Sequence, residues 1–175
     1  GRLDARVEGR GAVFLLTGEP GIGKTRLADA IAREAAGRGL RVAWARCWEG
    51  EGAPAYWPWI QVLGELDEVL PARPAATTDA ADARFAFFTA VTARLTETAR
   101  RAPLLLVLDD LHVADLSSLR LLEFVARSIR AIPIGIVGTY RETDARLSHD
   151  AGRTLISLAR EAVYLPLHRF NIEEI

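Results

Sequence analysis

The stretch Gly18-Glu19-Pro20-Gly21-Ile22-Gly23-Lys24-Thr25 follows directly on a short apolar run, Ala12–Leu16, and Thr17. It fits the phosphate-binding pattern G-x-x-x-x-G-K-[ST] at every defined position. The apolar run predicts a buried parallel strand. Glycines between a strand and a helix let backbone N–H groups turn inward around phosphate oxygens at the helix N-terminus. The sequence therefore predicts a strand, a phosphate-binding loop and a helix, in that order.

Lys24 is the only lysine among the 22 lysine and arginine residues of the chain. A compact, flexible ammonium suits the space beside the β- and γ-phosphates of a nucleotide, where a broad guanidinium fits poorly. We expect Lys24 on a surface loop, with the hydroxyl of Thr25 on Mg²⁺. The alternative is a glycine-rich turn that binds no ligand. The candidate nucleotide-binding residues are Gly18, Glu19, Pro20, Gly21, Ile22, Gly23, Lys24, Thr25 and Arg26.

Length and composition set the broad class of the chain. Half of its 175 residues are hydrophobic and its net charge is −1, which predicts one domain with a substantial core and no basic nucleic-acid-binding tail. Apolar runs such as Leu104–Leu108 are far too short to span a membrane, and the first residues given do not follow the pattern of a signal peptide. The single cysteine, Cys47, excludes an internal disulfide and fits a reducing cytoplasm. Because methionine is absent even at position 1, we expect residues 1–175 to be one nucleotide-binding domain excised from a larger protein.

Strand-like and helical segments alternate along the chain. The expected strands are Val13–Thr17, Arg41–Arg46, Leu104–Asp109, Ile134–Thr139 and Ala162–Leu167. The expected helices follow Lys24 and lie near Trp57–Leu70, Ala83–Arg100, Leu116–Ile129 and Asp150–Arg160. This alternation predicts an α/β fold, a five-stranded parallel sheet with helices on both faces and a binding edge at the carboxyl ends of the strands. Pro71–Asp82 is predicted to be a surface loop.

Two acids end the third expected strand. A nucleotide site needs Mg²⁺, and Mg²⁺ in turn needs a carboxylate, usually through water. We assign Asp109 to the metal shell, and Asp110 to orienting or deprotonating the water that attacks the γ-phosphate. The alternative is a buried strand that ends in two turn-starting aspartates.

The fourth expected strand ends in Gly138-Thr139-Tyr140-Arg141. A positive charge at this edge can contact the γ-phosphate, so Arg141 is a candidate catalytic residue. The alternative is a surface ion pair with Glu142 or Asp144.

Other polar and aromatic residues have structural explanations. Asp115 is expected to cap the next helix, His112 to be structural, and Cys47 to be buried and inert. The tryptophans of the segment from Trp48 to Trp59 are expected to pin a loop to the domain, although a ligand or partner surface is the alternative.

Five pieces of the sequence together resemble a bacterial signal-transduction ATPase of the STAND class, related to AAA+ proteins, and above all the ATPase module of large LuxR-type regulators. They are GEPGIGKTRL (Gly18–Leu27), RCWEGEGAPAYWPW (Arg46–Trp59), LLVLDDLHVAD (Leu105–Asp115), SLRLLEFVAR (Ser118–Arg127) and GTYR (Gly138–Arg141). The resemblance covers nearly the whole chain. It implies a three-layer P-loop NTPase of the ASCE type.

The resemblance also implies functional properties. It implies ATP and ADP as ligands, with the strand of Arg141 between the phosphate-loop strand and the strand of Asp109, and Arg141 as the γ-phosphate sensor. It implies a switch that is off with ADP and on with ATP, often through self-association. Its members usually add a helical lid, a winged-helix domain and sensor repeats, so we expect these domains to be partners of residues 1–175. We expect no direct nucleic-acid contact by this domain.

Other nucleotide-binding classes fit less well. A GTPase reads guanine with an Asn/Thr-Lys-x-Asp motif, and the only lysine is already used. An ABC ATPase needs a Ser-Gly-Gly signature, which does not occur in the sequence. Two alternatives to a weak ATPase stay open: a non-hydrolysing scaffold that keeps ADP, and a small-molecule kinase.

Overall fold

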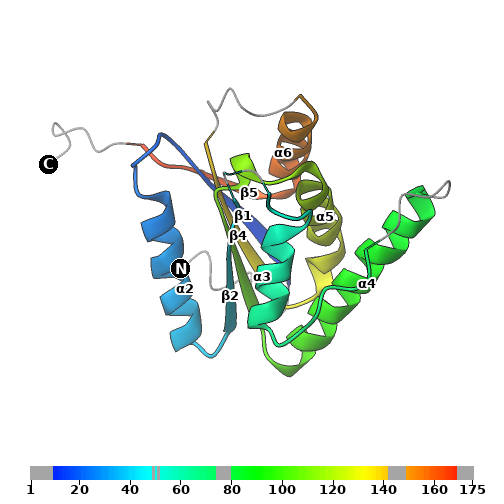
Figure 1. Cartoon of the computed structure of the whole chain (residues 1–175). Helices are drawn as coiled ribbons and strands as arrows, with labels where there is room; N and C mark the ends of the chain where they lie inside the picture. The colour runs from blue at the N-terminus through cyan, green and yellow to red at the C-terminus, as the bar shows by residue number, and fades with distance from the viewer. Residues whose placement is uncertain (1–9, 49, 51, 74–79, 142–148, 169–175) are drawn as a thin grey trace, which may run out of the picture.

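The computed structural model describes residues 10–48, 50, 52–73, 80–141 and 149–168, which form an α/β domain (Figure 1). Five strands make one parallel sheet in the order β2-β3-β4-β1-β5. Their bounds are β1 Ala12–Thr17, β2 Arg41–Arg46, β3 Leu104–Asp109, β4 Ile134–Tyr140 and β5 Val163–Pro166. The predicted strands are therefore confirmed, with ends that differ by one residue at most. The strand of Arg141 lies between the other two strands of the candidate site, as the resemblance implied.

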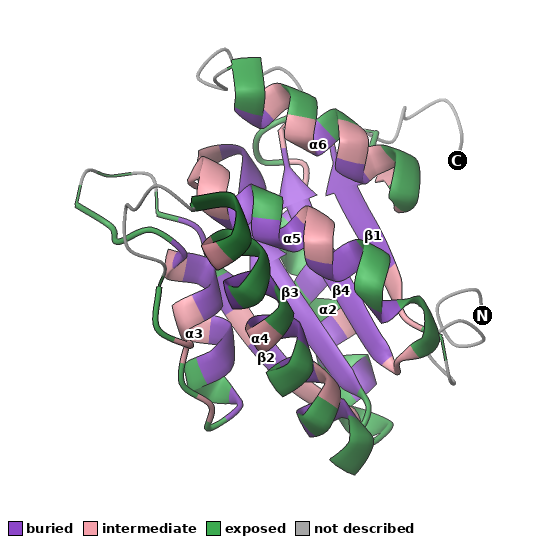
Figure 2. Ribbon diagram, turned by 90° about the vertical axis from the view of Figure 1, so that its right-hand side faces the viewer, coloured by how far each residue is buried: buried purple, intermediate pink, exposed green. Residues whose placement is uncertain are grey.

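Helices cover both faces of the sheet, which gives the three layers expected of this fold. One face carries α2 (Lys24–Gly37), and the other carries α3 (Trp57–Glu65), α4 (Ala80–Arg101), α5 (Leu116–Ser128) and α6 (His149–Glu161) (Figure 1). Two short 3₁₀ turns, η1 (Leu111–Val113) and η2 (Ile129–Ala131), flank α5. Figure 2 shows the central strands β1, β3 and β4 as almost wholly buried, because a parallel sheet between two helix layers has no wet face.

The two faces have cores of different size. Helix α2 presents Ala28, Ala32 and Ala35 to the sheet, at the i, i+4 and i+7 spacing of one helix face. Their small side chains let α2 lie close over Phe14, Leu16, Leu105, Val107 and Val137. The opposite face holds the larger core, where rings and branched side chains fill the space beneath four helices. The close packing of α2 fixes its first turn at the carboxyl edge of the sheet.

Strand β2 lies at one edge of the sheet, and α3 satisfies the outward-facing backbone groups there. The carboxylate of Glu65 accepts from the Trp44 N–H at 2.7 Å. The Gln61 amide accepts from the Arg46 N–H at 3.3 Å and donates to the Arg46 carbonyl at 2.9 Å. Side chains of α3 thus bond to backbone groups of β2 that a further strand would otherwise pair with.

One predicted loop is partly helical, and one predicted helical segment is shorter than expected. Pro71–Asp82 is not a loop throughout, because α4 begins at Ala80 and Asp82 lies in its first turn, where a negative charge favours the helix dipole. Residues 74–79 of that stretch lie outside the described part. The predicted segment Trp57–Leu70 is helical only as far as Glu65. In the described residues, no helix is both long enough and apolar enough to cross a membrane.

Candidate functional site

The phosphate-loop sequence forms the turn between β1 and α2. Gly21 and Gly23 have φ angles of 76° and 103°, a region that side-chain-bearing residues seldom adopt. Helix α2 begins at Lys24, and Gly23, at its N-cap, provides no side chain to its first N–H groups. Its first turn also carries no acidic residue. These N–H groups and the positive end of the helix dipole are therefore available to an anion.

Lys24 is buried, with 6% of its surface exposed. Its expected place on a surface loop is wrong, because the residue opens α2 and its side chain folds back beneath the loop. The ammonium donates to the carbonyls of Gly18 at 2.9 Å and Glu19 at 2.8 Å. Burial lowers the pKa of Lys24 and the positive charge of Arg141 lowers it further, while Asp110 and Asp109 oppose the change. Lys24 is a cation with incomplete charge compensation, which an anionic ligand would improve.

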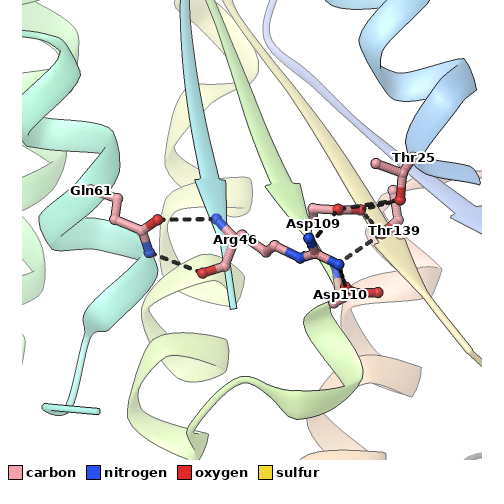
Figure 3. Close-up of polar contacts among 6 residues, drawn as sticks. All are labelled: Thr25, Arg46, Gln61, Asp109, Asp110 and Thr139. Carbon is pink, nitrogen blue, oxygen red and sulfur yellow. Dashed lines mark hydrogen bonds and ion pairs between the residues drawn. The ribbon is translucent and has the colours of Figure 1, made fainter. Parts of the chain in front are cut away.

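Thr25, Asp109 and Thr139 meet at the carboxyl edge (Figure 3). The Thr25 hydroxyl lies 3.0 and 3.2 Å from the two carboxylate oxygens of Asp109. The Thr139 hydroxyl donates to Asp109 Oδ1 at 2.6 Å. Asp109 is 1% exposed and Thr139 is fully buried, so this carboxylate is held by hydroxyl donors from two different elements.

Asp110 turns away from the strand in a left-handed conformation, with φ 61° and ψ 47°. Its carboxylate lies 3.3 Å from a guanidinium nitrogen of Arg46, whose Nε is also 4.0 Å from Asp109 Oδ2. Figure 3 shows the Arg46 side chain reaching from the end of β2 to both acids. Sequence reasoning gave Arg46 no role. The available signal was its place at the end of the strand that pairs with β3, opposite Asp109.

Arg141 follows β4 and lies close enough to Lys24 to affect its pKa. Its positive charge acts on Lys24 in the opposite sense to the charges of Asp110 and Asp109. Glu142 and Asp144, the alternative ion-pair partners, lie outside the described residues. Of the remaining loop residues, Glu19, Pro20 and Gly21 are exposed at the mouth of the site, as are Thr25 and Arg26, while Ile22 is partly covered.

Two of the flanking residues lie as expected, Asp115 as a helix cap and Cys47 in the interior. Asp115 caps α5, as predicted, and accepts from the Ser118 N–H at 2.9 Å and the Ser118 hydroxyl at 2.5 Å. Cys47 is buried, and burial, followed by the nearby acids, raises the pKa of its thiol to about 12. His112 is also buried.

The tryptophans of the segment from Trp48 to Trp59 differ from one another. Trp59 is fully buried and its indole N–H donates to the Ser118 carbonyl at 3.1 Å. Trp48 is 57% exposed. The interpretation of pinning rings is therefore confirmed for Trp59 and wrong for Trp48.

The geometry agrees with the match to a family model. Residues 1–137 match the model described as the AAA ATPase domain. The chain belongs to the AAA ATPase domain family. In AAA ATPase domains, as in other P-loop NTPases, the loop, the Mg²⁺-side hydroxyl and the strand-end acid are the parts that a nucleotide requires, and all three converge here.

Solved structures share the fold of this AAA ATPase domain. Cdc6p from Pyrobaculum aerophilum has a TM-score of 0.62 at 18% identity, covering 99% of this chain and 45% of its own. ORC2 of Aeropyrum pernix, solved in ADPNP–ADP complexes, has a TM-score of 0.58 at 20% identity, covering 95% and 45%. Drosophila ORC bound to GC-rich DNA and Cdc6 has a TM-score of 0.60 at 15% identity, covering 96% and 53%. The present chain thus spans about half the length of each. No curated protein matches it.

Proposed function

We propose that this AAA ATPase domain binds ATP and ADP with Mg²⁺ and hydrolyses ATP slowly, as the switch domain of a multidomain bacterial signalling or transcriptional regulator of the STAND class. One observation carries the proposal. The Thr25 hydroxyl contacts Asp109, 84 residues away in sequence, and Thr25 directly follows the only lysine, which is buried. A turn at the end of a strand that binds no ligand would not require Lys24, Thr25 and Asp109 to come together.

Thr25 and Asp109 fit the metal side of such a site. In the present contacts the hydroxyl proton of Thr25 points to the carboxylate, which leaves lone pairs on Thr25 Oγ1 available to a cation. Asp109 is an oxygen ligand of the kind that Mg²⁺ prefers, directly or through water. When bound, Mg²⁺ would neutralise charge on the β- and γ-phosphates.

Lys24 and the loop N–H groups fit the phosphates. Anionic oxygens at the start of α2 would meet the helix dipole and restore charge balance around Lys24. Arg141, whose charge acts on the same lysine, is the residue proposed to bind the γ-phosphate. The nucleotide-binding set of the proposal is therefore the whole loop Gly18–Arg26, with Arg141 as the residue that distinguishes ATP from ADP.

Asp110 is the residue proposed to orient or deprotonate the attacking water. Its contact with Arg46 ties up one carboxylate oxygen, which supports a slow reaction. The same contact favours a second candidate function, a scaffold that keeps ADP without turning over. Release of Asp110 from Arg46 is the step that separates an ATPase from a scaffold.

The regulatory part of the proposal rests on the resemblance of five sequence pieces to LuxR-type ATPase modules. The position of β4 between β1 and β3 supports only the role proposed for Arg141, because that order puts the end of β4 beside the end of the phosphate-loop strand. We propose a lid and a winged-helix domain of a parent chain as partners, ATP-dependent self-association, and a cytoplasmic location. Direct contact with nucleic acid is not part of the proposed role, since the net charge is −1.

Calorimetric titration of the chain with ADP, ATP and GTP, each with and without Mg²⁺, tests the binding. We expect micromolar or weaker binding of ADP and ATP, about −8 kcal/mol or less favourable, stronger with Mg²⁺, and weaker binding of GTP. A folded chain that binds none of these nucleotides would overturn the proposal. Multiple turnover of ATP by the multidomain protein would exclude the scaffold, and ADP that stays bound while no ATP is hydrolysed would establish it.

A further inference from the structure

One hydroxyl group connects the two acids of the site. Thr139, in β4, is fully buried, and its side-chain oxygen makes two hydrogen bonds. It donates its proton to Asp109 Oδ1 at 2.6 Å and accepts the backbone N–H of Asp110 at 2.9 Å. Neither the sequence patterns nor the proposed chemistry assigns Thr139 a role.

The proton positions of this network follow from the donors available. The Asp110 amide is a donor only, so it must occupy a lone pair of the Thr139 oxygen. The hydroxyl proton is then committed to Asp109. The Asp109 carboxylate therefore accepts from two hydroxyl groups, those of Thr139 and Thr25.

The two oxygens of Asp109 are thereby made unequal. Oδ1 receives the short bond from Thr139 and a contact of 3.0 Å from Thr25. Oδ2 has longer contacts, 3.2 Å to Thr25 and 4.0 Å to Arg46. Thr139 thus fixes the rotation of the carboxylate, and Oδ2 remains the less tightly held oxygen.

The turn at Asp110 depends on two neighbouring residues of β4, Thr139 and Gly138. Its left-handed backbone is an unfavourable conformation for a residue with a side chain, and the bond from its N–H to Thr139 holds it. The neighbouring Gly138 leaves room for the next residue of the turn, since a Cβ there would come within 2.5 Å of Leu111 Cδ1. Leu111 is 2% exposed, so the turn is anchored on both sides of Asp110.

We infer that Thr139 is a positioning residue for both acids: through one hydroxyl it sets the orientation of the Asp109 carboxylate toward Mg²⁺ and fixes the turn that aims Asp110. The inference rests on the proposed function for its consequence in ATP binding and hydrolysis. Its structural half, the fixed turn, does not require any nucleotide.

Three variants separate the hydroxyl from the shape of the side chain. Thr139→Val keeps the branched shape and removes the hydroxyl, whereas Thr139→Ser keeps the hydroxyl and removes the methyl group. Thr92→Val is the matched control, because Thr92 is also buried and its hydroxyl donates to the Phe88 carbonyl within α4, outside the site. All three are compared with the unaltered chain after thermal unfolding has confirmed that they fold.

The first measurement is amide hydrogen exchange at Asp110 in the nucleotide-free protein. We expect at least tenfold faster exchange in Thr139→Val, and near-normal exchange in Thr139→Ser and Thr92→Val. Unchanged exchange at Asp110 in Thr139→Val would overturn the inference. If Thr139→Val does not fold, the exchange rate of the Asp110 amide in Thr139→Ser decides the question. A rate equal to that of the unaltered chain supports a role of the hydroxyl, and a faster rate contradicts that role.

The second measurement is ATP affinity with and without Mg²⁺, together with single-turnover hydrolysis. In Thr139→Val we expect about a tenfold loss of the Mg²⁺-dependent gain in affinity, unchanged Mg²⁺-free binding, and a lower rate of hydrolysis that Thr139→Ser restores. Equal losses with and without Mg²⁺, or a Thr139→Ser variant as impaired as Thr139→Val, would overturn the inference. Failure of the unaltered chain to bind nucleotide would defeat the proposed function instead, and the exchange data would still decide the role of Thr139.

Discussion

The phosphate loop and the acid pair are built in different ways, although they face the same ligand. The loop from Gly18 to Thr25 is one continuous stretch whose donors are backbone N–H groups and the amine of its own lysine. The acid pair at Asp109 and Asp110 depends on side chains from three other elements, which contribute Thr25, Arg46 and Thr139. A local motif can therefore give the first half of the site, while the second half requires a correct sheet.

Nucleotide binding and hydrolysis should respond differently to substitutions in the phosphate loop and in the acid pair. The loop is expected to bind phosphate as a unit, and its single cation acts on every nucleotide. The two acids are expected to act separately, because Asp109 accepts from hydroxyl groups whereas Asp110 pairs with the guanidinium of Arg46. Substitutions can test this division, beginning with the acid pair, where the largest effect is expected.

Replacing the two acids one at a time distinguishes their roles. Asp110→Asn should spare nucleotide binding and slow hydrolysis by roughly 100- to 10,000-fold, the range for loss of a general base. Asp109→Asn should instead weaken Mg²⁺-dependent binding, because the residue is assigned to the ion. Single-turnover hydrolysis and titrations with and without Mg²⁺ measure the two effects. Normal hydrolysis in both variants would show that the acids are not divided in this way.

Removal of the loop cation should act on all nucleotides alike. Lys24→Ala is expected to weaken both ATP and ADP by about 3 kcal/mol, a hundredfold or more, because charge-assisted bonds to phosphate are lost. Arg33→Ala removes the same charge from the exposed face of α2, where Arg33 pairs only with Asp29 in the contacts described, and should leave affinity unchanged. Calorimetry checks both variants. Equal binding by Lys24→Ala and the unaltered chain would remove the loop from the proposed site.

Arg141→Ala should discriminate between nucleotides. A loss of about 2 kcal/mol is expected for ATP and little for ADP, since only ATP presents the γ-phosphate. The ratio of the two dissociation constants is the quantity to measure, in the presence of Mg²⁺. Equal losses of affinity for ATP and ADP would show that Arg141 does not sense the γ-phosphate.

The pKa of the Cys47 thiol depends on its burial and on the acids near it. The pKa of its thiol is raised from 9.0 to about 12 by burial and by Asp110, Asp115 and Asp109. The unfolded chain therefore loses this proton at lower pH than the folded chain does, so folding is weakened as pH rises above 9. At pH 10 the effect is about 1.4 kcal/mol. Denaturant unfolding of Cys47→Ala between pH 8 and 10 should show a smaller loss than the unaltered chain, and parallel curves would contradict the burial.

Much of the fold could be predicted from local pattern. Strand positions followed from apolar runs such as Leu104–Leu108, which are too short and too uniform for surface helices. The cap at Asp115 followed from an acid directly before a helical pattern. The start of α4 at Ala80 was missed because alanines and aspartates suit a loop as well as a first helical turn, and only packing of the later turns decides between them.

The sequence by itself determined the phosphate loop, the two acids at the end of β3 and the alternation of strands and helices, because each depends on neighbours within a few residues. Tertiary structure decided the burial of Lys24, the approach of Arg46 to Asp110 and the two bonds of Thr139. Those contacts join residues 29 to 64 positions apart, apart from the local turn at Lys24. The order and register of parallel strands set them, and hydrophobic periodicity carries no information about which strand lies beside which.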